Sequence, residues 1–444
     1  MINILLLGSG GREHAMAWKM LQSKLCRELF IAPGNPGTAT CGTNVSLSVN
    51  DFKAIGKFCL EKNIELLVVG PEDPLVNGIT DYFLADDSLK KIPVIGPDKT
   101  GAQLEGSKLF AKKFMQKYSI PTAAYKSFTK NELADAIKFL DTFSPPYVLK
   151  ADGLAAGKGV VIAQTKQEAV DTLNEMLVQS KFGVAGTTVV IEQFLSGIEV
   201  SVFIITDGIS YKILPEAKDY KRIGENDTGL NTGGMGAVSP VPFADEDFMR
   251  KVEERIIKPT ILGLHKEKIN YQGFIFFGLM ASPPSPLSKG RGGDSSPYPY
   301  VIEYNCRMGD PETEVVMPRI KSDLVEIFLA VAEQKLSQVV FETENYFAST
   351  VVVVSGGYPD NYEKGKIIIG MEDAKDVLVF HAGTSRNADG KLITSGGRVL
   401  AATATGNNLK ESLGKCYSKI NKIQFENSYY RKDIGKDLQL LLQE

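Results

Sequence analysis

Histidine is scarce in this sequence, with three residues among 444, and the three are dispersed along the chain. A histidine-based metal centre or catalytic cluster is therefore not expected. Cysteine is also scarce: the five residues are scattered, odd in number and outside any Cys-x-x-Cys spacing. That pattern excludes a disulfide framework and a zinc site, and it is typical of reduced thiols in the cytoplasm.

Long hydrophobic runs and clusters of basic residues are missing as well. No apolar run reaches membrane-spanning length, and the apolar start at residues 1–7 lacks a cationic flank, which predicts a buried strand and not a signal peptide. The formal net charge is -3 and the pI is about 5.9. We therefore expect no nucleic-acid or membrane partner. We expect a cytoplasmic monomer that acts on small molecules, with two to four domains.

The first hundred residues alternate between apolar strands and helices. Strands are predicted at residues 2–7, 64–70 and 93–97, and helices at 15–22 and 52–62. This alternation predicts a parallel sheet covered by helices. Ligands of such sheets bind where the strands end in loops.

The loop after the first strand, residues 8–14, resembles a dinucleotide-binding fingerprint. However, Glu13 stands where the third glycine is required, and no acidic residue closes a second strand at the usual distance. A nicotinamide-dependent oxidoreductase is thus a weak alternative. Gly10 and Gly11 still expose backbone N–H groups at the start of a helix, where a phosphate binds well, and Arg12 adds positive charge.

A second glycine-rich loop, residues 151–159, joins two predicted strands. It is not a P-loop, because Asp152 replaces the first required glycine, Gly159 replaces the Ser or Thr, and a strand follows instead of a helix. We interpret the loop as a hairpin flap that folds over a triphosphate with Lys158. Lys150 at the end of the preceding strand is a second phosphate-binding candidate. An ordinary glycine-rich hairpin is the alternative.

Two further stretches lack periodicity. Residues 215–240 predict a substrate loop, since long irregular loops in compact domains are usually functional or disordered. Residues 282–299 are rich in Pro, Ser and Gly, and we interpret them as a flexible insertion in a hairpin connection without chemistry.

From residue 336 onward, predicted strands at 348–354, 366–369, 377–384 and 397–402 precede a helix at 409–420 and indicate an antiparallel α+β module.

The stretch around residues 300–305 is the centre of the predicted site. It reads as a strand, so Glu303 and Asn305 share one face, about 7 Å apart. A carboxylate and an amide oxygen in this arrangement suit a hard cation whose other ligands are waters and phosphate oxygens. Arg307 follows this strand, and its permanently charged guanidinium is suited to bind a carboxylate or a phosphate through two hydrogen bonds. A solvated edge strand is the alternative interpretation.

Seven motifs in this order and spacing resemble the ATP-grasp superfamily and, within it, the phosphoribosylamine–glycine ligase (glycinamide ribonucleotide synthetase) family. They are GSGGREHA (8–15), APGNPGT (32–38), GPEDPLVNG (70–78), QLEGSK (103–108), KADGLAAGKGVVIA (150–163), DTGLNTGGMGAVSP (227–240) and EYNCRMGDPETE (303–314). The resemblance covers nearly the whole chain. The insertion at 282–299 is not part of the family pattern. Residues 273–280 lack the acid that many ATP-grasp enzymes place on the strand before Glu303, as expected for this subfamily, which leaves the ligands of a second metal open.

The resemblance implies ATP-dependent ligation of glycine to 5-phosphoribosylamine, with ATP and Mg²⁺ or Mn²⁺. The implied metal ligands are Glu303 and Asn305. The implied ATP-binding residues are Lys108, Lys150, Gly157, Lys158, Gly159, Glu192, Phe194, Leu195 and Glu199. The implied catalytic residues are Arg307, Asp310 and Lys221. The implied substrate-binding residues are Gly10, Gly11, Arg12, Glu13, Glu72, Asp73, Asp219, Asn231, Gly233 and Gly234.

The expected fold is α/β and α+β in several domains. An N-terminal parallel-sheet domain at 1–102 precedes an ATP-grasp domain at 103–335, whose hairpin lid subdomain lies at about 122–190. An antiparallel α+β domain at 336–444 ends the chain. Two alternatives stay open for the function: another ATP-grasp carboxylate–amine ligase, and a nucleotide-binding regulatory protein without turnover.

Overall fold

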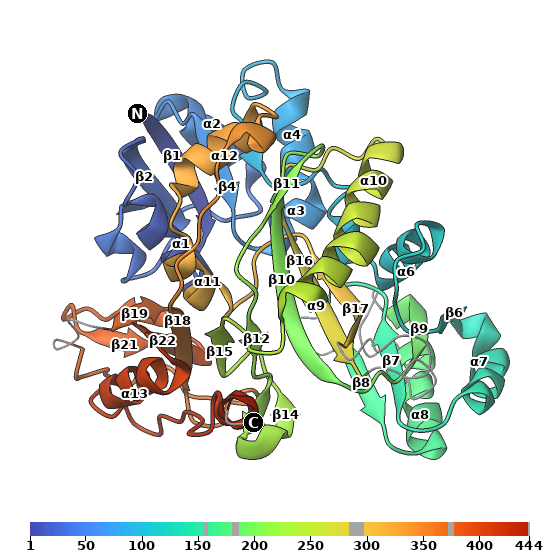
Figure 1. Ribbon diagram of the computed structural model, residues 1–444. Helices are drawn as coiled ribbons and strands as arrows, with labels where there is room; N and C mark the ends of the chain where they lie inside the picture. Colours follow the sequence, from blue (N-terminus) through green and yellow to red (C-terminus); the bar gives the residue numbers. More distant parts are fainter. Residues whose placement is uncertain (155–158, 180–185, 284–296, 372–376, 443–444) are drawn as a thin grey trace.

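The computed structural model describes residues 1–154, 159–179, 186–283, 297–371 and 377–442. Within these ranges, two five-stranded sheets, two four-stranded sheets and two two-stranded ribbons form a mixed α/β structure (Figure 1). The predicted fold class is confirmed. None of the helices in the described ranges has the length and apolarity needed to cross a membrane.

The N-terminal sheet is parallel, with the strand order β3-β2-β1-β4-β5. Its central strand β1 is buried from Asn3 onward and apolar from Ile4 onward, as expected for a parallel strand that helices cover on both faces. The strands are β1 (Ile2–Gly8), β2 (Cys26–Pro33), β3 (Thr43–Asn44), β4 (Leu66–Val69) and β5 (Val94–Ile95). The helices are α1 (Gly11–Met20), α2 (Phe52–Glu61), α3 (Glu72–Asn77) and α4 (Ile79–Ala85).

Two short helices lead from this domain into an antiparallel sheet with the order β6-β9-β7-β8. Helix α6 begins where the Ser107 side chain accepts a hydrogen bond from the Phe110 amide. The sheet has a hydrophobic core of its own beneath two helices. The elements are α5 (Gln103–Gly106), α6 (Lys108–Lys117), β6 (Tyr125–Thr129), α7 (Leu133–Phe139), β7 (Tyr147–Ala151), β8 (Val160–Ala163), α8 (Lys166–Leu173) and β9 (Thr188–Gln193).

The central sheet, with the order β11-β10-β16-β17, is antiparallel and lies between the N-terminal domain and the β6–β9 sheet (Figure 1). Its long strands β10 and β16 are buried over most of their length. The strands are β10 (Ile198–Thr206), β11 (Tyr211–Ile213), β16 (Gly273–Ser282) and β17 (Tyr298–Asn305). Helices α9 (Glu246–Val252) and α10 (Lys258–Lys266) precede β16 in the chain, and helices α11 (Thr313–Arg319) and α12 (Leu324–Ala332) follow β17.

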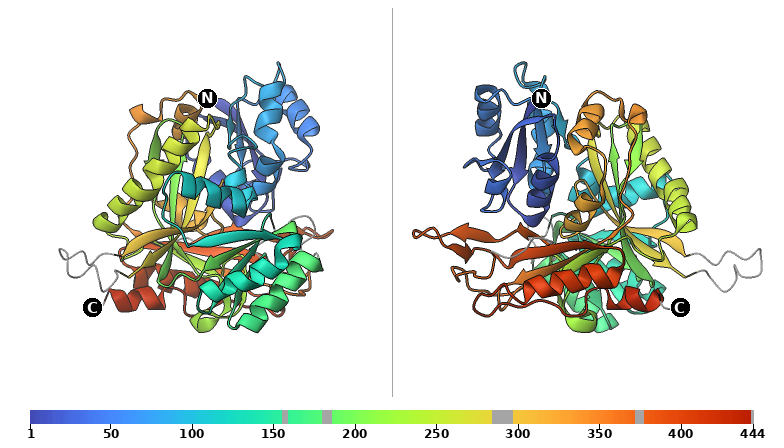
Figure 2. Two further views of the ribbon diagram at one scale, coloured as in Figure 1. Left: turned by 90° about the vertical axis from the view of Figure 1, so that its right-hand side faces the viewer. Right: turned by 60° about the vertical axis from the view of Figure 1, so that its left-hand side comes forward.

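The fourth sheet, with the order β12-β15-β18-β22-β19, combines strands from two distant parts of the chain. Figure 2 shows this sheet extending below the N-terminal domain. Its strands are β12 (Lys218–Asp219), β15 (Gly236–Ser239), β18 (Phe347–Val354), β19 (Leu378–His381) and β22 (Arg398–Gly406). The remaining elements are the ribbons β13 (Arg222–Gly224) with β14 (Thr228–Asn231) and β20 (Thr384–Arg386) with β21 (Leu392–Thr394), and the helices α13 (Leu409–Ile420) and α14 (Lys436–Leu441).

Three local predictions need correction. Residues 215–240 are not an irregular loop, because they contain four short strands, and β15 pairs with β18 more than a hundred residues later. Residues 366–369 form only isolated bridges and no strand. The predicted insertion at 282–299 is too wide at both ends, since Ser282 pairs with Tyr298 in the β16–β17 ladder. The interior of the insertion, residues 284–296, lies outside the described residues. The domain boundaries at 102 and 335 stay predictions.

Candidate active site

The end of β17 carries the two residues predicted to hold a metal. In the ladder with β16, Glu303 lies opposite Gly278. A Cβ atom at Gly278 would lie 2.9 Å from Cγ of Glu303, so the glycine leaves room for this side chain. Asn305 is 7% exposed, and its Nδ2 has no hydrogen-bond partner in the described part of the chain. The Nδ2 group is a hydrogen-bond donor and does not bind a cation, so the fit to a metal rests on the Glu303 carboxylate and the side-chain oxygen of Asn305, which are donors of the kind that hard cations prefer.

Positive charges surround Glu303. Burial alone would raise the pKa of Glu303, but the nearby ammonium groups of Lys221 and Lys150 outweigh it and lower that pKa. Lys221 itself lies 2.7 Å from Oε2 of Glu199. Burial would lower the pKa of Lys221, whereas Asp219, Glu199 and Glu303 raise it well above its usual range. The predicted residues Lys221, Glu199 and Asp219 thus belong to one charged cluster beside Glu303.

A buried carboxylate joins two lysines next to this cluster. Glu192 lies 2.9 Å from Nζ of Lys112 and 3.1 Å from Nζ of Lys150. Lys150 also donates a hydrogen bond to the carbonyl of Ile302 in β17, at 3.1 Å. Burial lowers the pKa of Lys112 to about 8, with Glu192 opposing and Lys150 assisting that change. Lys150 therefore lies directly against the strand that carries Glu303.

The predicted hairpin flap is confirmed as a connection between two antiparallel strands, β7 and β8. Its first part is fixed to helix α6, because the Asp152 carboxylate accepts hydrogen bonds from the Ser107 hydroxyl and the Leu109 amide, at 2.9 and 3.1 Å. Lys108 reaches the carbonyl of Gly153 at 3.5 Å. The carbonyl of Gly159 accepts from the Ala151 amide at 2.8 Å. The predicted ATP-binding residues Gly157 and Lys158 lie outside the described residues.

The link between β9 and β10 carries the predicted adenine-binding residues. Phe194 is 38% exposed and Leu195 is half-buried, although Glu192 two residues earlier is buried. The turn at Gly197 lies against the end of β16: a Cβ atom there would lie 2.3 Å from the carbonyl oxygen of Ala281. An accessible apolar segment therefore lies at the junction of the two antiparallel sheets, and its contact with adenine stays a prediction.

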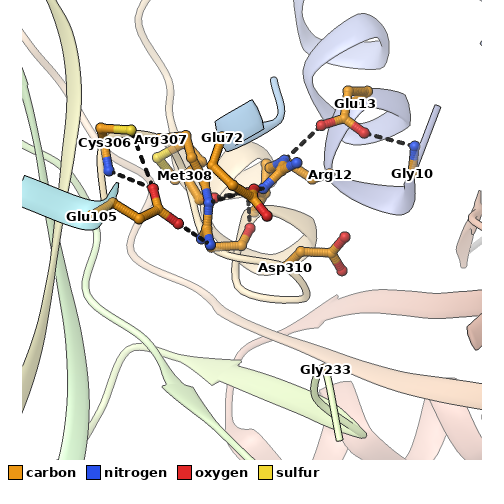
Figure 3. A network of polar contacts seen from close by, with 12 residues as sticks. Gly10, Arg12, Glu13, Glu72, Glu105, Gly233, Cys306, Arg307, Met308 and Asp310 are labelled. Atoms are coloured by element: carbon orange, nitrogen blue, oxygen red, sulfur yellow. Dashed lines mark hydrogen bonds and ion pairs between the residues drawn. The ribbon is translucent and has the colours of Figure 1, made fainter. Parts of the chain in front are cut away.

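Arg307, just after β17, is held by two carboxylates (Figure 3). Its guanidinium lies 2.7 Å from Oε1 of Glu105 and 3.3 Å from Oε2 of Glu72. Glu105 also accepts hydrogen bonds from the amide and the thiol of Cys306, at 2.9 and 3.2 Å. Burial would raise the pKa of Glu72, but Arg307 and Arg12 lower it to about 2. Glu72 is therefore ionised, and it links Arg307 to the N-terminal loop.

That loop is organised by Glu13. The Glu13 carboxylate accepts a hydrogen bond from the Gly10 amide and pairs with Nε of Arg12, both at 2.6 Å (Figure 3). The Gly10 amide is thus occupied by Glu13. Arg12 also donates to the carbonyl of Met308 at 3.3 Å, which joins the loop to the segment after Arg307.

A pocket of about 420 Å³ opens at this loop, lined by Gly8, Ser9, Gly10, Arg12, Glu13, Pro33, Ser48, Val49, Pro71 and Asp310. It brings Asp310 together with the predicted phosphate-binding loop. Gly11 is buried against the Glu314 carboxylate, since a Cβ atom at Gly11 would lie 2.3 Å from its Oε1. Asp73 is exposed, and no hydrogen bond or ion pair connects it to the other described residues of the site.

The predicted substrate loop reaches the same place only in part. A Cβ atom at Gly234 would lie 2.3 Å from Cδ of Pro311, so the loop touches the turn after Asp310. Gly233 lies beside this turn (Figure 3). Asn231, by contrast, is exposed and pairs with Arg222 in the β13–β14 ribbon. The structure therefore brings the two glycines to the site and leaves Asn231 outside these contacts.

Sequence reasoning missed several residues that shape the site: Glu105, Lys112, Glu312 and Arg398. Glu105 belongs to the QLEGSK motif, but nothing local shows that its carboxylate reaches Arg307. Glu312 follows the central motif, and its Oε1 accepts from the Ser201 hydroxyl at 2.9 Å. Burial raises the pKa of Glu312 to about 7, with Asp219 adding to the rise. The signal for Lys112, a lysine on the buried face of α6, was present in the helical periodicity.

Three domain models of one family match the chain in order. The phosphoribosylglycinamide synthetase N domain matches residues 2–105, the ATP-grasp (A) domain 106–313 and the C domain 348–437. A phosphoribosylamine–glycine ligase of Chlorobaculum tepidum is 47% identical over 441 residues, which cover 98% of this chain and 99% of that protein. The corresponding ligase of Escherichia coli O157:H7 is 44% identical over 438 residues, 98% of each chain.

Solved structures give the same result. The crystal structure of the phosphoribosylamine–glycine ligase of Thermotoga maritima has a TM-score of 0.82 and 38% identity, and covers 97% of this chain and 100% of that chain. A biotin carboxylase domain of Hydrogenobacter thermophilus has a TM-score of 0.70 at 15% identity, over 97% and 92% of the two chains, and shows the shared fold alone. The match of all three domain models, with this identity over nearly the full length, shows that the chain belongs to the phosphoribosylamine–glycine ligase family.

Proposed function

We propose that this protein ligates glycine to 5-phosphoribosylamine with ATP, giving glycinamide ribonucleotide, ADP and phosphate in purine biosynthesis. One observation carries the proposal: the segment from Arg307 to Pro311 connects the charged cluster at the end of β17 with the N-terminal loop. Arg12 of that loop donates to the Met308 carbonyl, and Asp310 lines the pocket beside it. A phosphorylated carboxylate formed at β17 would therefore lie beside an amine held at this loop.

The nucleotide would bind between the β6–β9 sheet and the central sheet. Lys108 and Lys150, with Lys158 of the flap, would neutralise the triphosphate, while the backbone around Glu192, Phe194 and Leu195 receives adenine. Glu199 would contact the ribose. Glu303 and Asn305 fit Mg²⁺ or Mn²⁺, since a carboxylate and a buried side-chain amide oxygen are the donor types that hard cations prefer.

In the described ranges, no three His, Cys, Asp or Glu side chains form a cluster that could hold a metal ion. We therefore assign two protein ligands and expect phosphate oxygens to complete the coordination. A bound divalent ion would supply charge neutralisation on the triphosphate.

The chemistry requires two displacements. The glycine carboxylate attacks the γ-phosphorus of ATP, and ADP leaves as glycyl phosphate forms. The amine of phosphoribosylamine then attacks the glycyl carbonyl carbon, phosphate leaves, and the amine loses one proton. Phosphoryl transfer of this kind depends mainly on positioning and charge stabilisation. Arg307, whose guanidinium is already oriented by Glu105 and Glu72, would hold the glycine carboxylate and the acyl phosphate, with Asp310 at the amine.

The N-terminal residues are assigned to phosphoribosylamine. Arg12 would bind its phosphate beside the loop at Gly10 and Gly11, where the Gly10 amide is already held by Glu13, and Glu72 and Asp73 would contact its ribose. Glu13 acts on this substrate through Arg12, which it holds at 2.6 Å. Lys221 would neutralise part of the negative charge of the carboxylates beside Glu303. The partners of this protein are thus small molecules, and we propose that it works as a monomer in the cytoplasm.

The test is phosphate release from ATP by the purified protein. We expect release that needs glycine and phosphoribosylamine together. Release supported by a different carboxylate or amine would identify another ATP-grasp ligase, and a protein that binds ATP without turnover under all these conditions would contradict the enzymatic assignment.

A further inference from the structure

Arg398 belongs to the C-terminal sheet and contacts the site at Asp310. It is the first residue of β22, and its Nη1 lies 3.0 Å from Oδ1 of Asp310 and donates to the Asp310 carbonyl at 2.8 Å. The same nitrogen donates to the carbonyl of Gly233. One guanidinium from the C-terminal sheet therefore joins the turn at Asp310 to the glycine loop that precedes β15.

Tyr358 supplies a second connection to this glycine loop. Its hydroxyl oxygen accepts a hydrogen bond from the Gly233 amide at 2.9 Å. Both backbone groups of Gly233 are thus bound by side chains of the C-terminal part of the chain. A Cβ atom at Gly233 would lie 2.8 Å from Cζ of Arg398, and Gly234 has φ +113°. Glycine at both positions permits the close approach.

We propose that Arg398 and Tyr358 are positioning residues for the amine substrate. They hold the carboxylate of Asp310 and the Gly233–Gly234 loop against the pocket at the N-terminal loop, so that the C-terminal domain completes the site. This inference rests on the proposed function, because that function assigns the pocket to phosphoribosylamine. It gives the C-terminal domain a part in substrate specificity in addition to its part in the fold.

The contacts of Arg398 combine charge with a fixed geometry. One nitrogen, Nη1, meets the Asp310 carboxylate and the carbonyl oxygens of Asp310 and Gly233, and the planar guanidinium fixes the direction of its N–H groups. Lysine keeps the positive charge opposite Asp310 but has a single flexible head group. Arg398→Lys should therefore retain the ion pair and lose part of the hold on the loop, which separates charge from geometry.

The experiment compares Michaelis constants of the full-length protein for its three substrates. Phosphoribosylamine, glycine and ATP are each titrated at saturating levels of the other two, for wild type, Arg398→Ala, Arg398→Lys and Tyr358→Phe. The matched control is Arg386→Ala, since Arg386 is an exposed arginine of the C-terminal domain that donates to Gly390 within its own ribbon.

We expect Arg398→Ala to raise KM for phosphoribosylamine at least about tenfold, with KM for ATP and for glycine within about twofold of wild type. Arg398→Lys should restore part of the loss, Tyr358→Phe should show a smaller rise of about threefold, and Arg386→Ala should behave as wild type. If Arg398→Ala does not fold, the same split in Arg398→Lys and Tyr358→Phe supports the inference.

Two results would overturn the inference: unchanged KM for phosphoribosylamine in every folded variant, or equal rises for all three substrates. A wild-type protein that does not need phosphoribosylamine at all would instead overturn the proposed function. The two failures are therefore distinguishable.

Discussion

Glu105 holds the guanidinium of Arg307 at 2.7 Å, and so fixes the segment that leaves the N-terminal domain to the end of β17. The Glu105 side chain is almost fully buried, and its second oxygen accepts from the Cys306 amide. The orientation of Arg307 therefore depends on a residue about 200 positions earlier in the sequence.

Glu105→Gln should lower both stability and turnover. Glutamine keeps an acceptor for the Cys306 amide but removes the charge that pairs with Arg307, and removal of one partner from a buried pair costs about 3 kcal/mol or more. Misplacement of Arg307 should reduce turnover at least about tenfold. Denaturant unfolding and steady-state kinetics measure both effects. Glu267→Gln, which removes a carboxylate from an exposed pair with Lys117, is the control, and equal behaviour of the two variants would contradict this role of Glu105.

Arg12→Ala should raise KM for phosphoribosylamine at least about tenfold, because it removes the positive charge from the pocket at the N-terminal loop. KM for glycine should stay near the wild-type value. Arg27→Ala is the control, since Arg27 forms an exposed pair with Glu65 on the same domain. An effect of Arg12→Ala confined to glycine would mean that the N-terminal domain binds a different substrate.

Lys112 should make stability depend on pH. Its pKa is lowered to about 8 by burial, whereas an unfolded lysine keeps its proton up to about 10.5. Between these values unfolding takes up a proton, so the contribution of Lys112 to stability rises with pH, by up to about 3 kcal/mol from pH 8 to 10.5.

The measurement is the free energy of unfolding of wild type and Lys112→Met from pH 7.5 to 10.5. The difference, wild type minus variant, should increase with pH. Lys113→Met changes the neighbouring exposed lysine and should give a constant difference. A difference for Lys112→Met that is constant or falls with pH would contradict the lowered pKa.

Deletion of residues 285–296 should leave activity and Tm nearly unchanged. The flanking strands pair up to Ser282 and Tyr298, so the ladder does not need the deleted residues. Loop-closure free energy also changes slowly with length. Kinetics and thermal unfolding of the deletion variant check this, and a large loss of activity would show that the insertion contributes to the site.

Regular elements with a clear pattern could be predicted from the sequence. Strand β8 at Val160–Ala163 follows the 151–159 loop as predicted, and helix α13 at Leu409–Ile420 has the predicted bounds, because hydrophobic periodicity and a helix-capping Asn408 define them locally. Strands β12 and β15 could not be found, since they are short and form only by pairing within a sheet whose other strands lie over a hundred residues away.

The site shows the same division. Glu303, Asn305 and Arg307 could be proposed because strand alternation places them together. Glu105 and Arg398 could not, because their contacts with Arg307 and Asp310 join residues that are distant in sequence. Long-range ion pairs of this kind leave no periodic signal.

The central claim is that the end of β17 holds the metal used for phosphoryl transfer. Glu303→Gln keeps the shape of the side chain and removes its charge, while the exposed Glu342 gives the control variant Glu342→Gln. The measurement is ADP formation, with all substrates present, against magnesium concentration. Because a bound metal supplies several kcal/mol of transition-state stabilisation, we expect Glu303→Gln to lower the rate at least about a hundredfold and to shift the magnesium dependence to higher concentration. A near-normal rate with unchanged magnesium dependence would place the metal elsewhere and contradict this account.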